Sequence, residues 1–199
     1  MSLEAPGNDR PLLKSPLPKI PYDWSADGQL LFFGVLDPKT NWDVMVMKLP
    51  DGTPMPFVST PADERSVRMS PTGRWIAYGS NADGPFEIYV QAFPGSGARW
   101  QVSRGGGSQV QWRRDGRELY YVAPDRKLMA VEVNPTGSTF TRGEAHALMD
   151  TRMTGWERTG GGCCQYAPSH DGQRFLINTA TNAAIPITVA VNWSAALRR

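Results

Sequence analysis

In two segments of the chain, small aliphatic side chains alternate with longer or polar ones at the two-residue period of a half-buried β-strand. Val44 and Val46 alternate with longer or polar residues from Asp43 to Leu49, and small aliphatic residues do the same from Glu87 to Phe93. Other segments, such as LLFF at 30–33, are short continuous apolar runs, which are typical of central strands covered on both faces. The pattern predicts many short strands and an all-β fold.

A tight turn recurs four times, in the segments SADGQL, SPTGRW, RRDGRE and SHDGQR. Its glycines are Gly28, Gly73, Gly116 and Gly172, at spacings of 45, 43 and 56 residues. Each turn follows one predicted strand and leads into a second, and a third strand comes after a polar loop. A period in the forties that is built of short strands is typical of β-propeller blades.

An outer strand completes three of the four repeats. The predicted outer strands are 54–60, 99–105 and 144–150, whereas the last repeat ends with the strand 186–192. Residues 10–15, RPLLKS, precede the first turn and have the pattern of an orphan outer strand. We therefore expect segment 1–19 to supply a strand that closes the ring with the last blade.

The sequence thus predicts one domain, a β-propeller of about four blades within residues 20–199. The expected blades lie near 22–60, 66–105, 109–150 and 163–193. Four blades form a small ring with steep angles between blades, and open sheet edges promote aggregation. Either a compact four-bladed ring or a half-propeller completed by a second chain would satisfy the pattern. The second is favoured, so we expect self-association as a homodimer.

Three of the four turns carry aspartate before glycine, namely Asp27, Asp115 and Asp171, and the second carries Thr72. Calcium needs roughly six to eight converging oxygen ligands, and each turn offers one carboxylate. A side-chain oxygen at this position instead accepts a hydrogen bond from a backbone N–H, and glycine adopts a positive φ without steric cost. We interpret the aspartates as hairpin residues, a role that threonine fills more weakly.

Charge and hydropathy exclude some partners. The net charge is +2, from 21 basic and 19 acidic residues that are spread along the chain, so neither nucleic-acid binding nor membrane insertion is expected. No run of about eighteen apolar residues occurs, and the first residues do not form a signal peptide. We expect a cytoplasmic protein, or a periplasmic or extracellular one if the chain is a fragment of an exported protein.

Several long segments carry a family resemblance: 23–33, 70–106, 110–133, 171–178 and 187–199. In their order and motifs they resemble the TolB-type, WD-repeat-like β-propeller modules found at the carboxyl end of bacterial serine/threonine kinases. The resemblance implies four-stranded blades and a role in protein–protein interaction or sensing. Such modules usually have more blades, and this chain has no kinase motif, so it resembles a half-propeller on its own.

Candidate catalytic residues are few. No G-x-S-x-G nucleophile motif occurs, and no motif links His146 or His170 to a serine or cysteine. The adjacent Cys163 and Cys164 are too few to hold zinc and would form a strained ring if bridged. We interpret them as reduced thiols at the start of a strand; the alternative is a redox pair or a metal site shared across a dimer.

The insertion 150–162 is the best candidate for a binding loop. It lengthens the last repeat and carries Arg152, Trp156, Glu157 and Arg158 among glycines. Long loops on a rigid scaffold concentrate binding residues, and Trp and Arg are frequent at interface hot spots. The alternative is a disordered connection with one buried tryptophan.

The sequence therefore favours a binding or assembly module that is not an enzyme and needs no cofactor or metal. A protein partner or a second copy of the chain is expected. The rival hypothesis is a small hydrolase or lactonase-like propeller with a metal in its central channel. That hypothesis requires inward carboxylates from several blades, for which Asp23, Asp63 and Glu64 are candidates.

The hairpin interpretation of the turns makes a prediction at position 72. Thr72→Asp is expected to leave the free energy of unfolding unchanged or to raise it by about 0.5 kcal/mol, because aspartate accepts the turn hydrogen bond better than threonine. Denaturant unfolding of the variant and the wild type measures this difference. A loss of more than about 1 kcal/mol would mean that position 72 does more than form the turn.

Overall fold

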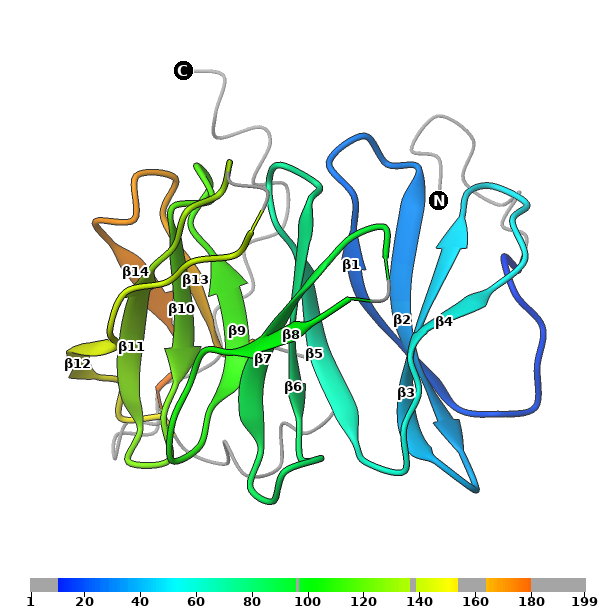
Figure 1. The fold of residues 1–199 in the computed structure, drawn as a ribbon, viewed down its shortest axis with the longest axis horizontal. Coiled ribbons are helices and arrows are strands. Elements are labelled where there is room, and N and C mark those ends of the chain that lie inside the picture. The colour runs from blue at the N-terminus through cyan, green and yellow to red at the C-terminus, as the bar shows by residue number, and fades with distance from the viewer. Residues whose placement is uncertain (1–10, 96, 137–138, 154–163, 180–199) are drawn as a thin grey trace, which may run out of the picture.

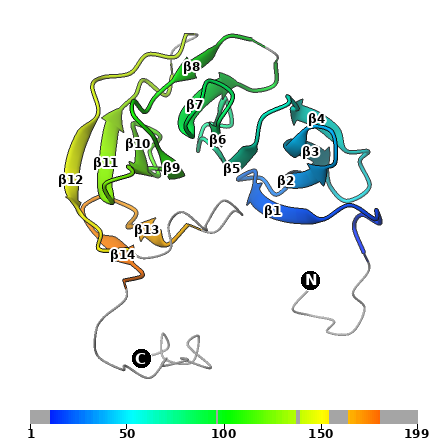
Figure 2. The same cartoon turned by 90° about the horizontal axis from the view of Figure 1, so that it is seen from below.

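The structure is a computed structural model that describes residues 11–95, 97–136, 139–153 and 164–179. Over these residues the chain forms antiparallel sheets that stand side by side along an arc (Figures 1 and 2). Three sheets have four strands and one has two, each in simple sequence order. The described part contains no helix long and apolar enough to cross a membrane.

The strands fall into four blades, numbered here along the chain. Blade 1 contains β1 (Lys19–Trp24), β2 (Leu30–Asp37), β3 (Asn41–Lys48) and β4 (Met55–Val58). Blade 2 contains β5 (Glu64–Met69), β6 (Trp75–Ser80), β7 (Glu87–Ala92) and β8 (Arg99–Gln101). Blade 3 contains β9 (Ser108–Trp112), β10 (Glu118–Val122), β11 (Lys127–Glu132) and β12 (His146–Asp150). The described part of blade 4 contains β13 (Tyr166–Pro168) and β14 (Phe175–Ile177).

The predicted all-β partial propeller is confirmed. In Figure 2 the first strand of each blade lies toward the inside of the arc, and β4, β8 and β12 lie outside. The expected strand at 186–192 lies outside the described residues. The strand expected at 10–15 is wrong for its described part, because residues 11–15 form no strand. Pro11, Pro16 and Pro18 lack the N–H groups that a strand ladder needs, and the first strand begins at Lys19, on the inside of the arc.

The four turns have the expected geometry. Each turn glycine has φ between +69° and +73°, and its N–H donates to the carbonyl three residues earlier at 2.8–3.0 Å. In the first turn, Asp27 Oδ1 accepts hydrogen bonds from Ser25 Oγ at 2.6 Å and from the N–H of Gln29 at 3.0 Å. The Ser25 hydrogen bond lowers the pKa of Asp27. Thr72 Oγ1 keeps only the first of these contacts, to Ser70 Oγ at 3.0 Å.

Apolar side chains fill the junctions between neighbouring blades. Junction 1–2 contains Phe32, Val44, Val46, Val67, Ile76, Tyr78 and Tyr89. Junction 2–3 contains Trp75, Ala77, Ile88, Val90, Leu119, Tyr121 and Val131. Junction 3–4 contains Tyr120, Val122, Leu128, Ala130 and Tyr166. Since burying one such side chain contributes about 1.5–3 kcal/mol, this packing is the main stabilising contact between blades.

A carboxylate fixes the connection from blade 2 to blade 3. Glu87, buried at the start of β7, accepts hydrogen bonds from Ser103 Oγ and from the N–H of Gly106, the latter at 2.9 Å. Ser103 Oγ in turn accepts the N–H of Ile88 at 2.7 Å. Gly106 has φ +110°, and a Cβ there would lie 2.4 Å from Cγ of Pro124. Only glycine fits this connection without strain.

Gly106→Ala is therefore expected to lower the free energy of unfolding by roughly 2–4 kcal/mol, from the disfavoured φ and the collision with Pro124. Gly97→Ala is the matched control, because no atom lies within 4 Å of a Cβ at that position. Chemical denaturation of both variants tests the assignment. Equal stabilities would mean that the connection relaxes freely and that its geometry is not required.

Candidate functional site

A row of polar side chains lies on the inner strands of blades 1 to 3, five residues before the turn glycine of each blade. The row contains Asp23 in β1, Arg68 in β5 and Gln111 in β9. Arg68 connects blades: its guanidinium donates to the carbonyl of Tyr22, to Gln111 Oε1 at 3.2 Å and to Cys164 Sγ at 3.5 Å. The inner row therefore joins blade 2 to blades 1, 3 and 4.

Asp23, the first candidate carboxylate, also connects blades. Its Oδ2 accepts the N–H of Met69 from blade 2 at 2.8 Å. Burial raises the pKa of Asp23, while the Met69 N–H and the charge of Arg68 partly oppose that rise. The side chain thus faces its neighbouring blade and serves the junction.

Asp63 and Glu64, the other two candidates, lie where blade 1 leads into blade 2. Asp63 pairs with Arg65 at 2.9 Å and accepts the N–H of Trp42 at 3.3 Å. Glu64 is fully buried, and its Oε1 accepts hydrogen bonds from Thr60 Oγ1 at 2.5 Å and from Ser80 Oγ at 3.4 Å. Across residues 11–95, 97–136, 139–153 and 164–179, no group of three or more His, Cys, Asp or Glu side chains is placed to hold a metal ion.

The predicted binding loop lies mostly outside the described residues, as do Trp156, Glu157, Arg158 and Cys163. Arg152 is described: it is exposed, has φ +51°, and its N–H donates to Asp150 Oδ1 at 2.9 Å. This hydrogen bond lies directly after the end of β12.

The remaining sequence candidates lie apart in the fold. Cys164 is half-buried beside Arg68, 3.8 Å from the carbonyl oxygen of Val110. His146 is exposed on the outer strand β12, and His170 is exposed in the turn of blade 4.

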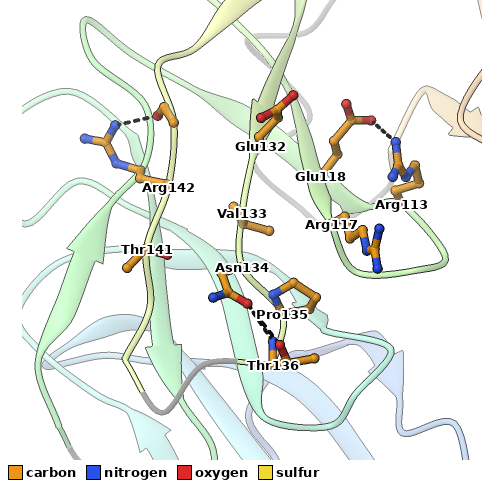
Figure 3. A pocket seen from close by; sticks show the side chains of 11 residues that line it. Arg113, Arg117, Glu118, Glu132, Val133, Asn134, Pro135, Thr136, Thr141 and Arg142 are labelled. Carbon is orange, nitrogen blue, oxygen red and sulfur yellow. Dashed lines mark hydrogen bonds and ion pairs between the residues drawn. The ribbon is translucent and has the colours of Figure 1, made fainter.

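A pocket on blade 3, which the sequence did not indicate, collects several charged side chains (Figure 3). Its volume is about 640 Å³, and its lining comes from the β10 turn, the end of β11 and the segment that returns toward β12. The lining includes Arg113, Arg117, Glu118, Glu132, Asn134, Thr136, Thr141 and Arg142. The floor is regular backbone, since Val133 N–H donates to Arg117 O at 2.9 Å and Asn134 N–H to Thr141 O at 3.1 Å.

The guanidinium of Arg113 is paired with two neighbouring carboxylates. Its Nε and Nη2 donate to both carboxylate oxygens of Asp115 at 2.7 and 2.6 Å, and its Nη1 donates to Glu118 at 2.9 Å. The Arg113 hydrogen bonds lower the pKa of Asp115 to about 2 and raise that of Arg113. Glu118 also accepts the hydroxyl of Tyr120 at 2.6 Å. One guanidinium thus faces two carboxylates, and the charge of Arg117 also acts on Asp115.

Arg117 and Arg142 differ from Arg113, because neither forms an ion pair within the described chain. Arg117 is exposed on the same side of the pocket as Arg113, and Arg142 lies across Val133 (Figure 3). Arg142 is held by carbonyls, with Nε donating to Gln101 O at 2.8 Å and Nη1 to Gly143 O at 3.2 Å. Two arginines without an ion pair therefore border the pocket beside the exposed carboxylate of Glu132; the guanidinium of Arg142 is fixed by the two carbonyls and points away from Arg117 (Figure 3).

The burial of Glu64 predicts a pH effect on stability. Burial, with a smaller contribution from Asp43, raises the pKa of Glu64 from 4.5 to about 7. The folded chain then binds this proton more tightly than the unfolded chain, so stability that is present below about pH 4.5 is lost as the pH rises through 7. Asp63 and Arg65 are the other charged groups nearby.

Glu64→Gln stays neutral and is expected to lack this loss. Between pH 5 and 8 the free energy of unfolding of the wild type should fall relative to that of Glu64→Gln by at most about 3 kcal/mol. Denaturant melts across this range measure it, with the exposed Glu144→Gln as control. Parallel pH profiles for the wild type and Glu64→Gln would contradict the assignment.

Comparisons with known proteins bear on the fold. No protein-family model matches the chain, and no curated protein matches it. Among solved structures, TolB from Acinetobacter baumannii superimposes with a TM-score of 0.59 at 15% identity, over 83% of this chain and 39% of that one. A protein assigned as TolB from Agrobacterium tumefaciens gives 0.53 at 17% identity, over 69% of this chain and 53% of that one. The chain thus spans about half or less of the length of these proteins, and its fold is that of a partial TolB-like β-propeller.

Proposed function

We propose that the chain is a non-catalytic binding module that recognises an acidic segment of a protein partner in the blade 3 pocket. The observation that carries this proposal is the pair of arginines, Arg117 and Arg142, that border the pocket without an ion pair in the described chain. A carboxylate bound at either arginine would gain charge-assisted hydrogen bonds, which are stronger than neutral ones.

The surroundings support a binding role. Arg113 is already paired with Asp115 and Glu118, so it does not compete with Arg117 and Arg142 for an acidic ligand. Arg142 is held by two carbonyls, which lowers the entropy lost when it binds a carboxylate. Glu132 sets a limit on the ligand, since it repels a second carboxylate at its end of the pocket and favours a basic or neutral group there.

The absence of catalysis is also part of the proposal. The carboxylates that the rival hypothesis requires contact neighbouring backbone or side chains: Asp23 accepts Met69 N–H, Asp63 pairs with Arg65, and Glu64 contacts Thr60. These contacts support a structural role for all three. The kinase context implied by the resemblance stays a prediction.

Fluorescence anisotropy with labelled hexapeptides tests the proposal. Each acidic peptide is paired with a counterpart in which Asn or Gln replaces Asp or Glu. We expect at least one acidic peptide to bind about tenfold more tightly than its counterpart, and this preference should weaken as salt is added. Arg117→Ala should remove most of the preference, because it deletes one of the two cationic groups.

Arg104→Ala is the matched control, since Arg104 is exposed and does not line the pocket. Circular dichroism checks that both variants keep their strands. The proposal fails if no acidic peptide is preferred, or if Arg104→Ala weakens binding as much as Arg117→Ala does.

A further inference from the structure

The blade 4 end of the arc, called here its trailing face, exposes an apolar side chain at a position that is buried in every earlier blade. Four residues after each turn glycine, Phe32 and Ala77 are 0% exposed and Tyr120 is 1% exposed, whereas Leu176 is 79% exposed. The three buried residues face the blade that follows. Tyr120, for example, packs edge-on against Phe175 of blade 4, with ring centroids 5.0 Å apart. Leu176 therefore marks the face where a following blade would pack.

The blade 1 end of the arc, called here its leading face, also exposes an apolar side chain whose repeat equivalents are packed. Trp24 is 54% exposed, and it lies four residues before its turn glycine. The residues at this position in blades 2 and 3 are Met69, which packs into junction 1–2, and Trp112, which is 8% exposed. Trp112 Nε1 donates to the carbonyl of Arg68 in the preceding blade at 3.1 Å. Trp24 therefore lies on the face where a preceding blade would pack.

The two faces match through the repeat. The residue that accepts from Trp112 is Arg68, whose cross-strand neighbour is Ala77. In blade 4 the corresponding cross-strand pair is Ala167 and Leu176, and both residues are exposed. Blade 4 thus offers an incoming tryptophan the same arrangement that blade 2 offers Trp112.

We propose that two copies of this chain associate head to tail, with Trp24 of each copy packed on Ala167 and Leu176 of the other. The described blades form only part of a ring (Figure 2), and a second copy supplies both a leading and a trailing face. Such a contact between identical chains closes when the rotation that it imposes returns to the start, here after two copies. The contact uses a surface separate from the blade 3 pocket, so it does not depend on peptide binding.

The mass in solution is the first test. Light scattering after size exclusion, at several micromolar concentrations, is expected to give twice the 21.9 kDa of one chain. A monomer at all concentrations overturns the proposal. A mass that rises beyond two copies overturns the closed pair, because it shows an open polymer.

Substitutions at the two faces identify the contact. Trp24→Glu or Leu176→Glu alone should raise the dissociation constant of the pair at least tenfold, since each introduces a carboxylate into an apolar contact. Both side chains are exposed within one chain, so the fold should persist, and circular dichroism checks this. Met55→Glu is the matched control: Met55 is 61% exposed on the outer strand β4, away from both proposed faces, and its substitution should leave the mass unchanged.

Mixing the two single variants tests the head-to-tail geometry. In a mixed pair one contact carries both glutamates, and the other joins an intact Trp24 to an intact Leu176. Mixing Trp24→Glu with Leu176→Glu should therefore restore a dimer at a concentration at which each variant alone is mainly monomeric. No recovery on mixing, or a dimer that persists in both single variants, overturns the proposal.

Discussion

The packing of one blade against the next is the contact on which the rest of this structure depends. Each blade is a sheet with two apolar faces, so it can bury both faces only between two neighbours. Junctions 1–2, 2–3 and 3–4 satisfy this requirement with tightly packed aromatic and aliphatic side chains. Polar contacts then fix the blades relative to one another: Arg68 joins blade 2 to Tyr22, Gln111 and Cys164, and Glu87 holds the connection to blade 3.

The repeat was predictable because its signals are local in the sequence. The turn glycines with positive φ and the strand-length apolar runs predict the blades, and even the hairpin role of Asp27 follows from the two residues around it. The N-terminal strand was misplaced because an apolar patch outweighed its prolines, which prevent a regular ladder at residues 11–15. The blade 3 pocket was not predictable, because Arg117 and Arg142 are 25 positions apart and their segments meet only through hydrogen bonds of Val133 with Arg117 and of Asn134 with Thr141.

Side-chain length explains why two blade junctions use their carboxylates differently. Asp43 and Glu87 are the cross-strand partners of Val35 and Ser80, which both lie seven residues after their turn glycines. The two carboxylates therefore occupy the same position in the repeat. Glu87 is long enough to reach the N–H of Gly106, whereas Asp43 is one methylene shorter and contacts Thr40 within its own blade, at 2.7 Å. In junction 1–2, Glu64 instead accepts the hydrogen bond from the Thr60 hydroxyl. Glu64 occupies the repeat position that Gly107 occupies at the next junction. Two buried carboxylates then share one junction; burial raises the pKa of Glu64, and Asp43 adds a smaller contribution.

The same repeat logic separates structural from functional surfaces. A polar group on an inner strand that contacts the next blade, such as Asp23, is explained by the junction and needs no ligand. Trp24 and Leu176 are different, because their repeat equivalents are packed in blade junctions, whereas these two side chains are exposed and have no such partner among the described residues. Arg117 differs again: it has no equivalent role in a junction, and it stands at a pocket instead of a blade face. Exposed residues that break the repeat are therefore the informative ones, since blade packing explains the buried positions and leaves these unexplained.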